Sequence, residues 1–251
     1  MKSANDIRAM KSKEPVAMLT VYDYPTARAL DTCDLDILFV GDSVAQNELG
    51  LDRPAELSLE MMLHHLKAVA RGVESTHLMA DLPYGSYKGP EDALVSALAL
   101  VDAGANSVKL EGPRFDVVGH LTDAGIPVMG HVGLLPQTAR RYVRQGTKPE
   151  SAARIIDQAI GLVEAGCFAI VLEFMSDKTA RSITSEVDVP TIGIGAGQAC
   201  DGQVLVITDM LGQHENVPSF VRKYAHLFEV TVDAAKRYRD DVKMGHFPSA
   251  S

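Results

Sequence analysis

The sequence has no tryptophan, and aromatic residues occupy only 6% of its 251 positions. Sites that bind sugars or nucleobases rely on aromatic faces for stacking, so this scarcity argues against carbohydrate and nucleobase chemistry. Cysteine is almost as rare, with Cys33, Cys167 and Cys200 far apart in the chain. Three scattered thiols are too few for a disulfide framework or a zinc site, and we expect a reduced, cytoplasmic protein.

Basic residues are fewer than acidic ones, and long apolar runs are absent. The 24 Lys and Arg residues are outnumbered by 33 Asp and Glu residues, which gives a formal net charge of −9. Such a chain repels phosphate backbones, so no nucleic-acid partner is expected. No run reaches the roughly 18 apolar residues of a transmembrane helix, and the residues after Lys2 are not those of a signal peptide. We therefore expect no membrane association.

An alternation of short apolar runs with helical stretches fills the chain. Most of the runs are continuous rather than alternating, which is typical of strands buried on both faces of a parallel sheet. The expected strands are Val16–Thr20, Ile37–Val40, His77–Ala80, Ser107–Leu110, Pro127–Gly130, Ala169–Leu172, Thr191–Ile194 and Val204–Ile207. The expected helices are Pro25–Thr32, Ser58–Arg71, Arg114–Ala124, Lys178–Val187 and Val230–Lys243, with two more that begin at Pro90 and Pro149.

This pattern predicts an α/β protein with a single (β/α)8 barrel domain over residues 1–251. A doubly wound open sheet would show the same alternation of strands and helices. The sequence contains no Pro/Ser-rich linker and no break in composition, which favours the barrel.

Five consecutive expected strands, from the second to the sixth, deliver ionisable residues to their carboxyl ends. These residues are Asp42, Asp81, Lys109 with Glu111, His131 and Glu173. In a barrel those ends form the rim that carries catalytic groups. A single acid there is often only a helix cap, but clustered carboxylates destabilise a fold unless a cation lies among them. Ligands that are all oxygen suit magnesium better than zinc.

Lys109 precedes Glu111 by two residues, so in a strand both side chains face the same side. If that side is the barrel interior, an ammonium group lies beside the carboxylates and can hold an anionic substrate. The alternative is an internal Lys–Glu pair with no role in substrate binding.

Two short segments at strand ends contain glycines. Gly41–Ala45 has the form of a G-x-S-x-A nucleophile elbow, but an α/β-hydrolase carries that elbow mid-chain, with an acid and then a histidine after it. We therefore interpret Ser43 as a hydrogen-bond donor to a ligand. Gly193–Gly197 follows the seventh expected strand, where barrels often bind phosphate, although ordinary turn chemistry explains these glycines equally well.

Eight segments spread over nearly the whole chain resemble the ketopantoate hydroxymethyltransferase family, and together they are highly specific. They are Met18–Arg28, Val40–Ser43, Ala80–Tyr87, Val108–Gly112, Gly125–His131, Phe168–Glu173, Pro190–Gly197 and Cys200–Leu205. The sequence departs from the family pattern at Ala45–Glu48, and at Arg140 and Arg141, which stand where the family usually has glycines.

The resemblance implies transfer of a hydroxymethyl group from 5,10-methylenetetrahydrofolate to 3-methyl-2-oxobutanoate, giving 2-dehydropantoate on the way to pantothenate and coenzyme A. It implies that an enolate of the magnesium-chelated keto acid is the nucleophile. By the same resemblance Asp42, Asp81 and Glu111 bind Mg²⁺, and Glu173 is the catalytic base. Substrate contacts fall on Asp42, Ser43, Asp81, Lys109 and His131. The family forms homo-oligomers, commonly decamers.

Three other functions remain as alternatives. The first is a magnesium-dependent 2-oxo acid lyase or mutase that works without folate, on a barrel of the phosphoenolpyruvate mutase and isocitrate lyase kind, to which we expect this barrel to belong. The second is a non-catalytic barrel, against which the complete set of rim residues argues. The third is a glycoside hydrolase with paired carboxylates, which the absence of tryptophan and the presence of Lys109 disfavour.

Overall fold

In the computed structural model, which describes residues 1–248, eight parallel strands follow one another in chain order and close into a barrel. The strands are β1 (Val16–Thr20), β2 (Ile37–Val40), β3 (His77–Asp81), β4 (Ser107–Lys109), β5 (Val128–Gly133), β6 (Ala169–Glu173), β7 (Thr191–Ile194) and β8 (Gly202–Leu205). The ring closes where Val16 N donates to Asp201 O at 3.0 Å. The predicted barrel is therefore confirmed, and the open sheet is excluded.

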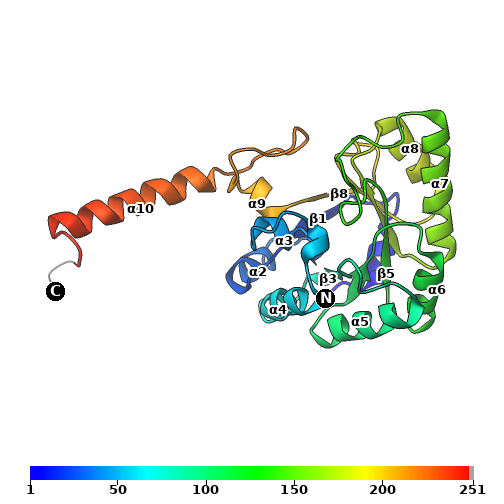
Figure 1. Ribbon diagram of the computed structural model, residues 1–251, viewed down its shortest axis with the longest axis horizontal. Helices are drawn as coiled ribbons and strands as arrows, with labels where there is room; N and C mark the ends of the chain where they lie inside the picture. The colour runs from blue at the N-terminus through cyan, green and yellow to red at the C-terminus, as the bar shows by residue number, and fades with distance from the viewer. Residues whose placement is uncertain (249–251) are drawn as a thin grey trace. The chain divides into compact units, whose positions relative to one another are not determined.

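Helices alternate with these strands, and Figure 1 shows α5, α6, α7 and α8 on the outside of the barrel. The helices are α1 (Ala4–Arg8), α2 (Tyr24–Leu30), α3 (Val44–Asn47), α4 (Leu59–Ala70), α5 (Pro90–Asp102), α6 (Phe115–Asp123), α7 (Pro149–Glu164), α8 (Asp177–Glu186), α9 (Ile207–Met210) and α10 (Leu227–Met244), with a 3₁₀ turn at Pro54–Glu56. Asp23, Ser58 and Ser176 cap α2, α4 and α8 through their side-chain oxygens. Proline in the first turn begins α5 and α7.

Strand register sets which residues share the rim. Every residue of β2 and β3 is buried, because the barrel interior covers one face and the helices cover the other. Asp81 pairs in register with Lys109, and Gly133 pairs with Glu173. Lys109 in turn pairs with Met129, and Met129 pairs with Ala169, so β5 and β6 run four residues past the position at which β3 and β4 end. This stagger accompanies the tilt of strands in a barrel, and the ionisable residues of these strands lie at one rim.

The opposite end of the barrel is filled by apolar side chains and covered by α1. Ile7 and Met10, from α1 and the turn after it, belong to the same buried cluster as Met18, Met79 and Met129 from the strands. The segment is also attached to the first residue of β3, because a ring nitrogen of His77 lies 3.0 Å from Lys2 O. The amino-terminal end of the barrel is therefore closed by packed apolar side chains.

The last expected strand differs from the observed one. We expected Val204–Ile207, but β8 spans Gly202–Leu205 and Ile207 begins α9. Strand β8 approaches β1 so closely that a Cβ at position 202 would overlap Val16 O. Only glycine permits this approach, and a search for apolar runs does not find a strand that begins with glycine.

The chain divides into two compact units, Met1–Val204 and a second unit from Leu205. In the second unit, Tyr224 N donates to Met210 O at 2.8 Å and Leu227 N donates to Leu211 O at 2.9 Å, so the segment before α10 folds back onto α9. The expectation of one domain over residues 1–251 stays a prediction. Within residues 1–248, every helix is too short or too polar to span a lipid bilayer.

Gly133 is required where β5 passes the end of β6. Its φ is +103°, and an added Cβ would overlap the carbonyl oxygen of Glu173. We expect Gly133→Ala to lower the free energy of unfolding by roughly 2–3 kcal/mol, since backbone strain and overpacking both contribute. Urea unfolding measures this change. Gly119→Ala is the control, because a Cβ in α6 meets nothing within 4 Å and alanine favours a helix; equal stability of the two variants would contradict the prediction.

Candidate active site

Two aspartates lie side by side at the rim. Asp81 ends β3, and Asp42 lies in the turn after β2. The backbone N–H of Asp42 donates to Asp81 Oδ2 at 2.9 Å. Both side chains are buried. Burial raises the pKa of Asp81 to about 7; the charge of Asp42 adds to this effect, and the ammonium of Lys109 opposes it. A cation bound here would favour the ionised form of Asp81.

Lys109, the last residue of β4, supplies a positive charge to this pair. Its Nζ lies 2.7 Å from Asp81 Oδ1 and 5.4 Å from the centre of the Phe39 ring. Burial disfavours the ammonium, but the carboxylates of Asp81, Asp42 and Glu111 outweigh burial and raise the pKa of Lys109. The lysine therefore stays charged, and it pairs with Asp81 on the neighbouring strand rather than with Glu111, which lies just beyond the end of β4.

Glu111 reaches the cluster from the loop after β4. Its Oε2 accepts a hydrogen bond from the backbone N–H of Gln137 at 3.1 Å, and its Oε1 lies 3.8 Å from His131 Nδ1. Burial, followed by the charge of Asp42, raises its pKa well above the usual value. Asp42 meets the same glutamine, because Gln137 Nε2 donates to Asp42 Oδ2 at 2.8 Å. Asp42, Asp81, Lys109 and Glu111 thus form one connected group.

His131 connects this group to Glu173. Its Nδ1 lies 3.4 Å from Lys109 Nζ, and its Nε2 lies 3.2 Å from Glu173 Oε2 without the alignment of a hydrogen bond. Burial and then the nearby ammonium lower the pKa of His131 well below its usual value, so the ring is neutral. Since an ammonium only donates, Nδ1 is the acceptor and the proton is on Nε2, facing Glu173.

Glu173 ends β6, and its side chain is 19% exposed. Burial raises its pKa to about 7, against the opposing effect of Lys109. The next residue, Phe174, has a φ of +42°, a conformation that side-chain-bearing residues seldom adopt. Such strain is concentrated at functional sites. A carboxyl group that titrates near neutrality and retains access to solvent is suited to accepting a proton from a substrate.

Ser43 follows Asp42 in the chain, but its hydroxyl contacts a tyrosine rather than one of the charged rim residues. Its Oγ is 2.7 Å from the hydroxyl of Tyr22, a partner that the sequence analysis missed because a tyrosine after the first strand has no distinctive spacing. This pairing with a tyrosine does not support a hydrolase-type nucleophile, for which a histidine is needed as general base. Gly197, in the other glycine segment, has a φ of +88°, and a Cβ there would overlap Asp177 Oδ1. Turn geometry thus accounts for this glycine.

The carboxylate oxygens at the rim suit Mg²⁺ better than a metal ion whose ligands all come from protein side chains. Among residues 1–248, no three His, Cys, Asp or Glu side chains form a ready-made metal-binding group. Magnesium is usually held by one or two carboxylates and keeps oxygen ligands from water or substrate. The buried Asp81 Oδ1 accepts no well-aligned hydrogen bond from a described residue, although Lys109 is near it. Asp42 and Asp81, with Glu111 nearby, are therefore suitable ligands.

The raised pKa of Glu173 predicts a pH-dependent change in stability. A carboxyl group whose pKa is higher in the folded protein adds stability at low pH and loses that contribution as pH rises through about 7. Glutamine does not ionise, so Glu173→Gln should be more stable than the parent by roughly 1–3 kcal/mol above about pH 8. Urea unfolding across pH tests this expectation, with Glu164→Gln at an exposed position of α7 as the control. A constant difference across pH would contradict the assigned pKa.

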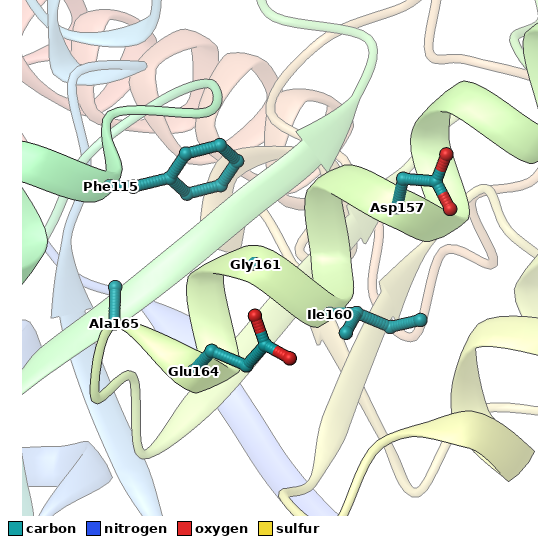
Figure 2. A pocket seen from close by; sticks show the side chains of 6 residues that line it. All are labelled: Phe115, Asp157, Ile160, Gly161, Glu164 and Ala165. Carbon is teal, nitrogen blue, oxygen red and sulfur yellow. The ribbon is translucent and has the colours of Figure 1, made fainter.

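A separate hollow of about 570 Å³ lies on the outer surface at α6 and α7. Figure 2 shows Phe115 from α6 facing the α7 side chains, and the lining residues are Phe115, Asp157, Ile160, Gly161, Glu164 and Ala165. Gly161 leaves room for the Phe115 ring, which a Cβ would approach to 2.8 Å. None of the rim residues lines this hollow, so it is not the candidate active site.

Comparison with known proteins identifies the family. The model of the ketopantoate hydroxymethyltransferase family matches residues 2–250. The chain belongs to this family. Among curated members, 3-methyl-2-oxobutanoate hydroxymethyltransferase of Thermococcus kodakarensis is 46% identical over 96% of this chain and 87% of its own length. The enzyme of the same name from Aeropyrum pernix is 43% identical, over 98% of this chain and 92% of its own length. This ketopantoate hydroxymethyltransferase family member is therefore an enzyme.

Solved structures with little sequence identity share the fold of this family member. A phosphoenolpyruvate phosphomutase from Streptomyces platensis subsp. rosaceus is 14% identical with a TM-score of 0.66, over 97% of this chain and 88% of that chain. A 2,3-dimethylmalate lyase, described as a member of the phosphoenolpyruvate mutase/isocitrate lyase superfamily, is 16% identical with a TM-score of 0.62, over 100% and 91%. These likenesses confirm the expected fold, a (β/α)8 barrel like those of the phosphoenolpyruvate mutase and isocitrate lyase kind.

Proposed function

We propose that this enzyme transfers a hydroxymethyl group from 5,10-methylenetetrahydrofolate to 3-methyl-2-oxobutanoate, forming 2-dehydropantoate in pantothenate and coenzyme A synthesis. Membership of the family supports this activity. One observation carries the assignment of roles: Glu173, with a pKa near 7, lies across His131 from a buried lysine set among carboxylates. That arrangement provides a proton acceptor on one side and an anion-binding charge on the other.

We assign binding of the keto acid to the Asp42–Asp81–Lys109 side of the site. Asp42, Asp81 and Glu111 would hold Mg²⁺, which when bound supplies a Lewis acid toward a keto oxygen. The charged Lys109 would attract the carboxylate of the substrate, as an ammonium does with any anion in a partly dehydrated site. Ser43, at the end of the same turn as Asp42, would donate a hydrogen bond to the substrate.

Glu173 would remove the proton from C3 of the keto acid. Its ionised form is required, and its pKa of about 7 makes both protonation states accessible near neutrality. Negative charge that develops on the keto oxygen would be stabilised by the ammonium of Lys109. His131, neutral and protonated on Nε2, lies 3.2 Å from Glu173 Oε2 and would donate a hydrogen bond to the carboxylate once the two groups align around a bound substrate. C3 is then the carbon that accepts the one-carbon unit from the folate.

Proton NMR of 3-methyl-2-oxobutanoate in deuterated buffer with Mg²⁺ tests this function. The C3 proton signal should disappear as enzyme-catalysed exchange proceeds, and tetrahydrofolate with formaldehyde should produce a new hydroxymethyl signal. Chelation of the metal should abolish both changes. Exchange without transfer would favour a folate-independent 2-oxo acid enzyme on the same barrel. The absence of both signals would overturn the proposal.

Assembly and location also remain predictions. We propose a homo-oligomer, which light scattering of the purified chain would measure, in a cytoplasmic enzyme whose partners are a small 2-oxo acid and a folate. Arg140 and Arg141 lie exposed in the loop after β5. A kinetic comparison of glycine variants at these two positions would show whether they alter the use of folate.

A further inference from the structure

Gln137 is buried among the rim carboxylates although it belongs to a loop. It lies four residues beyond the end of β5, and it is 1% exposed. Long polar side chains are seldom buried this completely without hydrogen-bond partners. The partners of Gln137 are therefore informative about its role.

Both polar atoms of the Gln137 side-chain amide have defined partners. Nε2 donates to Asp42 Oδ2 at 2.8 Å and to Leu82 O at 3.1 Å, so both of its hydrogens are used. Oε1 accepts a hydrogen bond from the hydroxyl of Tyr87. The Tyr87 ring is buried and has Arg114 over its face at 5.7 Å. A rotated amide would point oxygen at two acceptors, so only the observed orientation is favourable.

The same residue also contacts a second carboxylate through its backbone. The N–H of Gln137 donates to Glu111 Oε2 at 3.1 Å while its side chain donates to Asp42 Oδ2. One uncharged residue therefore holds acids from the ends of β2 and β4 and occupies one oxygen of each. Because like charges repel, buried carboxylates without such donors would rotate away from one another.

We propose that Gln137 is a positioning residue that, with Tyr87 fixing its amide, presents the carboxylates of Asp42 and Glu111 to a divalent cation. This inference rests on the proposed function, which assigns the cation to these acids. Partners that orient metal ligands are required for affinity, and their loss typically weakens metal binding by about 10–100-fold. Gln137 itself need not touch the cation or the substrate.

Binding of Mn²⁺ alone, followed by electron paramagnetic resonance of the free ion, tests the role without relying on activity. Gln137→Met keeps the length and the backbone N–H but removes both amide donors, and we expect roughly 10-fold or weaker Mn²⁺ binding. Tyr87→Phe keeps the glutamine and removes only its anchor, so we expect a smaller weakening of about 3-fold. Gln145→Met is the matched control, since the side chain of that glutamine donates to Val143 O and, among residues 1–248, to no other partner.

The outcomes separate this inference from the proposed function. If the parent enzyme binds no Mn²⁺, the assignment of a cation site fails, and the inference falls with it. If the parent binds and Gln137→Met binds equally well, the inference alone is wrong. Should Gln137→Met fail to fold by circular dichroism, Tyr87→Phe decides, and unchanged binding in it overturns the role. At saturating Mg²⁺ we also expect kcat of Gln137→Met to recover to within about 3-fold, which a general packing defect would not allow.

Discussion

Glu173→Gln is expected to lower kcat by roughly 10²–10⁴-fold, the range over which a general base contributes to proton abstraction. The amide keeps the size of the carboxyl group but cannot accept the C3 proton. Deuterium exchange at C3 of 3-methyl-2-oxobutanoate measures this step without folate, and it should be lost in parallel with transfer. Binding of Mn²⁺ should change by less than about 3-fold, since Glu173 is not among the proposed ligands.

The same residue should set the rising limb of the pH profile. Because the base must be ionised and its pKa is about 7, kcat of the parent should increase with pH through about 7 and then level off. Glu164→Gln removes an exposed carboxylate on α7 and should leave both kcat and the profile unchanged. Exchange at the parental rate in Glu173→Gln would show that another group abstracts the proton.

The rim could be predicted from sequence because strands in a barrel are simple to recognise. A strand that is buried on both faces has a continuous apolar run, and its end is marked by the first ionisable residue. Asp81 and Glu173 were found in this way and end β3 and β6, whereas Lys109, expected inside the strand Ser107–Leu110, is the last residue of β4. Their assignment as catalytic and binding residues stays a prediction that the geometry supports.

Contacts between strands could not be predicted in the same way. Spacing predicts that Lys109 and Glu111 lie on one side of a strand, yet Glu111 lies beyond the end of β4 and the ammonium of Lys109 pairs with Asp81. That pairing follows from the register of β3 with β4, which a single sequence does not reveal. The local period of a strand gives the direction of a side chain but not its neighbour on the next strand.

Loop residues were the largest omission. Gln137, Tyr87 and Tyr22 lie outside the periodic segments, and each meets the rim only because of the path that its loop takes. Short helices were missed for a related reason, since α1, α3 and α9 span only four or five residues. Segments of that length depend on tertiary contacts rather than on their own propensity.

Lys109→Met is expected to destabilise the fold and to impair catalysis together. Removing one partner of a buried ion pair typically costs about 3–5 kcal/mol, and here Asp81, which is 1% exposed, would lose its ammonium. Loss of the charge that stabilises a developing oxyanion should also lower kcat by roughly 10²–10³-fold. Urea unfolding and the C3 exchange rate measure the two effects, and Lys67→Met, at an exposed position on α4, is the control.

Added Mg²⁺ separates an electrostatic defect in Lys109→Met from a packing defect. Carboxylates that have lost their ammonium should attract a divalent cation more strongly, so Mg²⁺ should raise the melting temperature of the variant more than that of the parent. Activity should not return with stability, because the proposed anion-binding charge is still missing. Recovery of the exchange rate by Mg²⁺ would mean that Lys109 only balances the charge of Asp81, and the substrate role proposed for it would then be wrong.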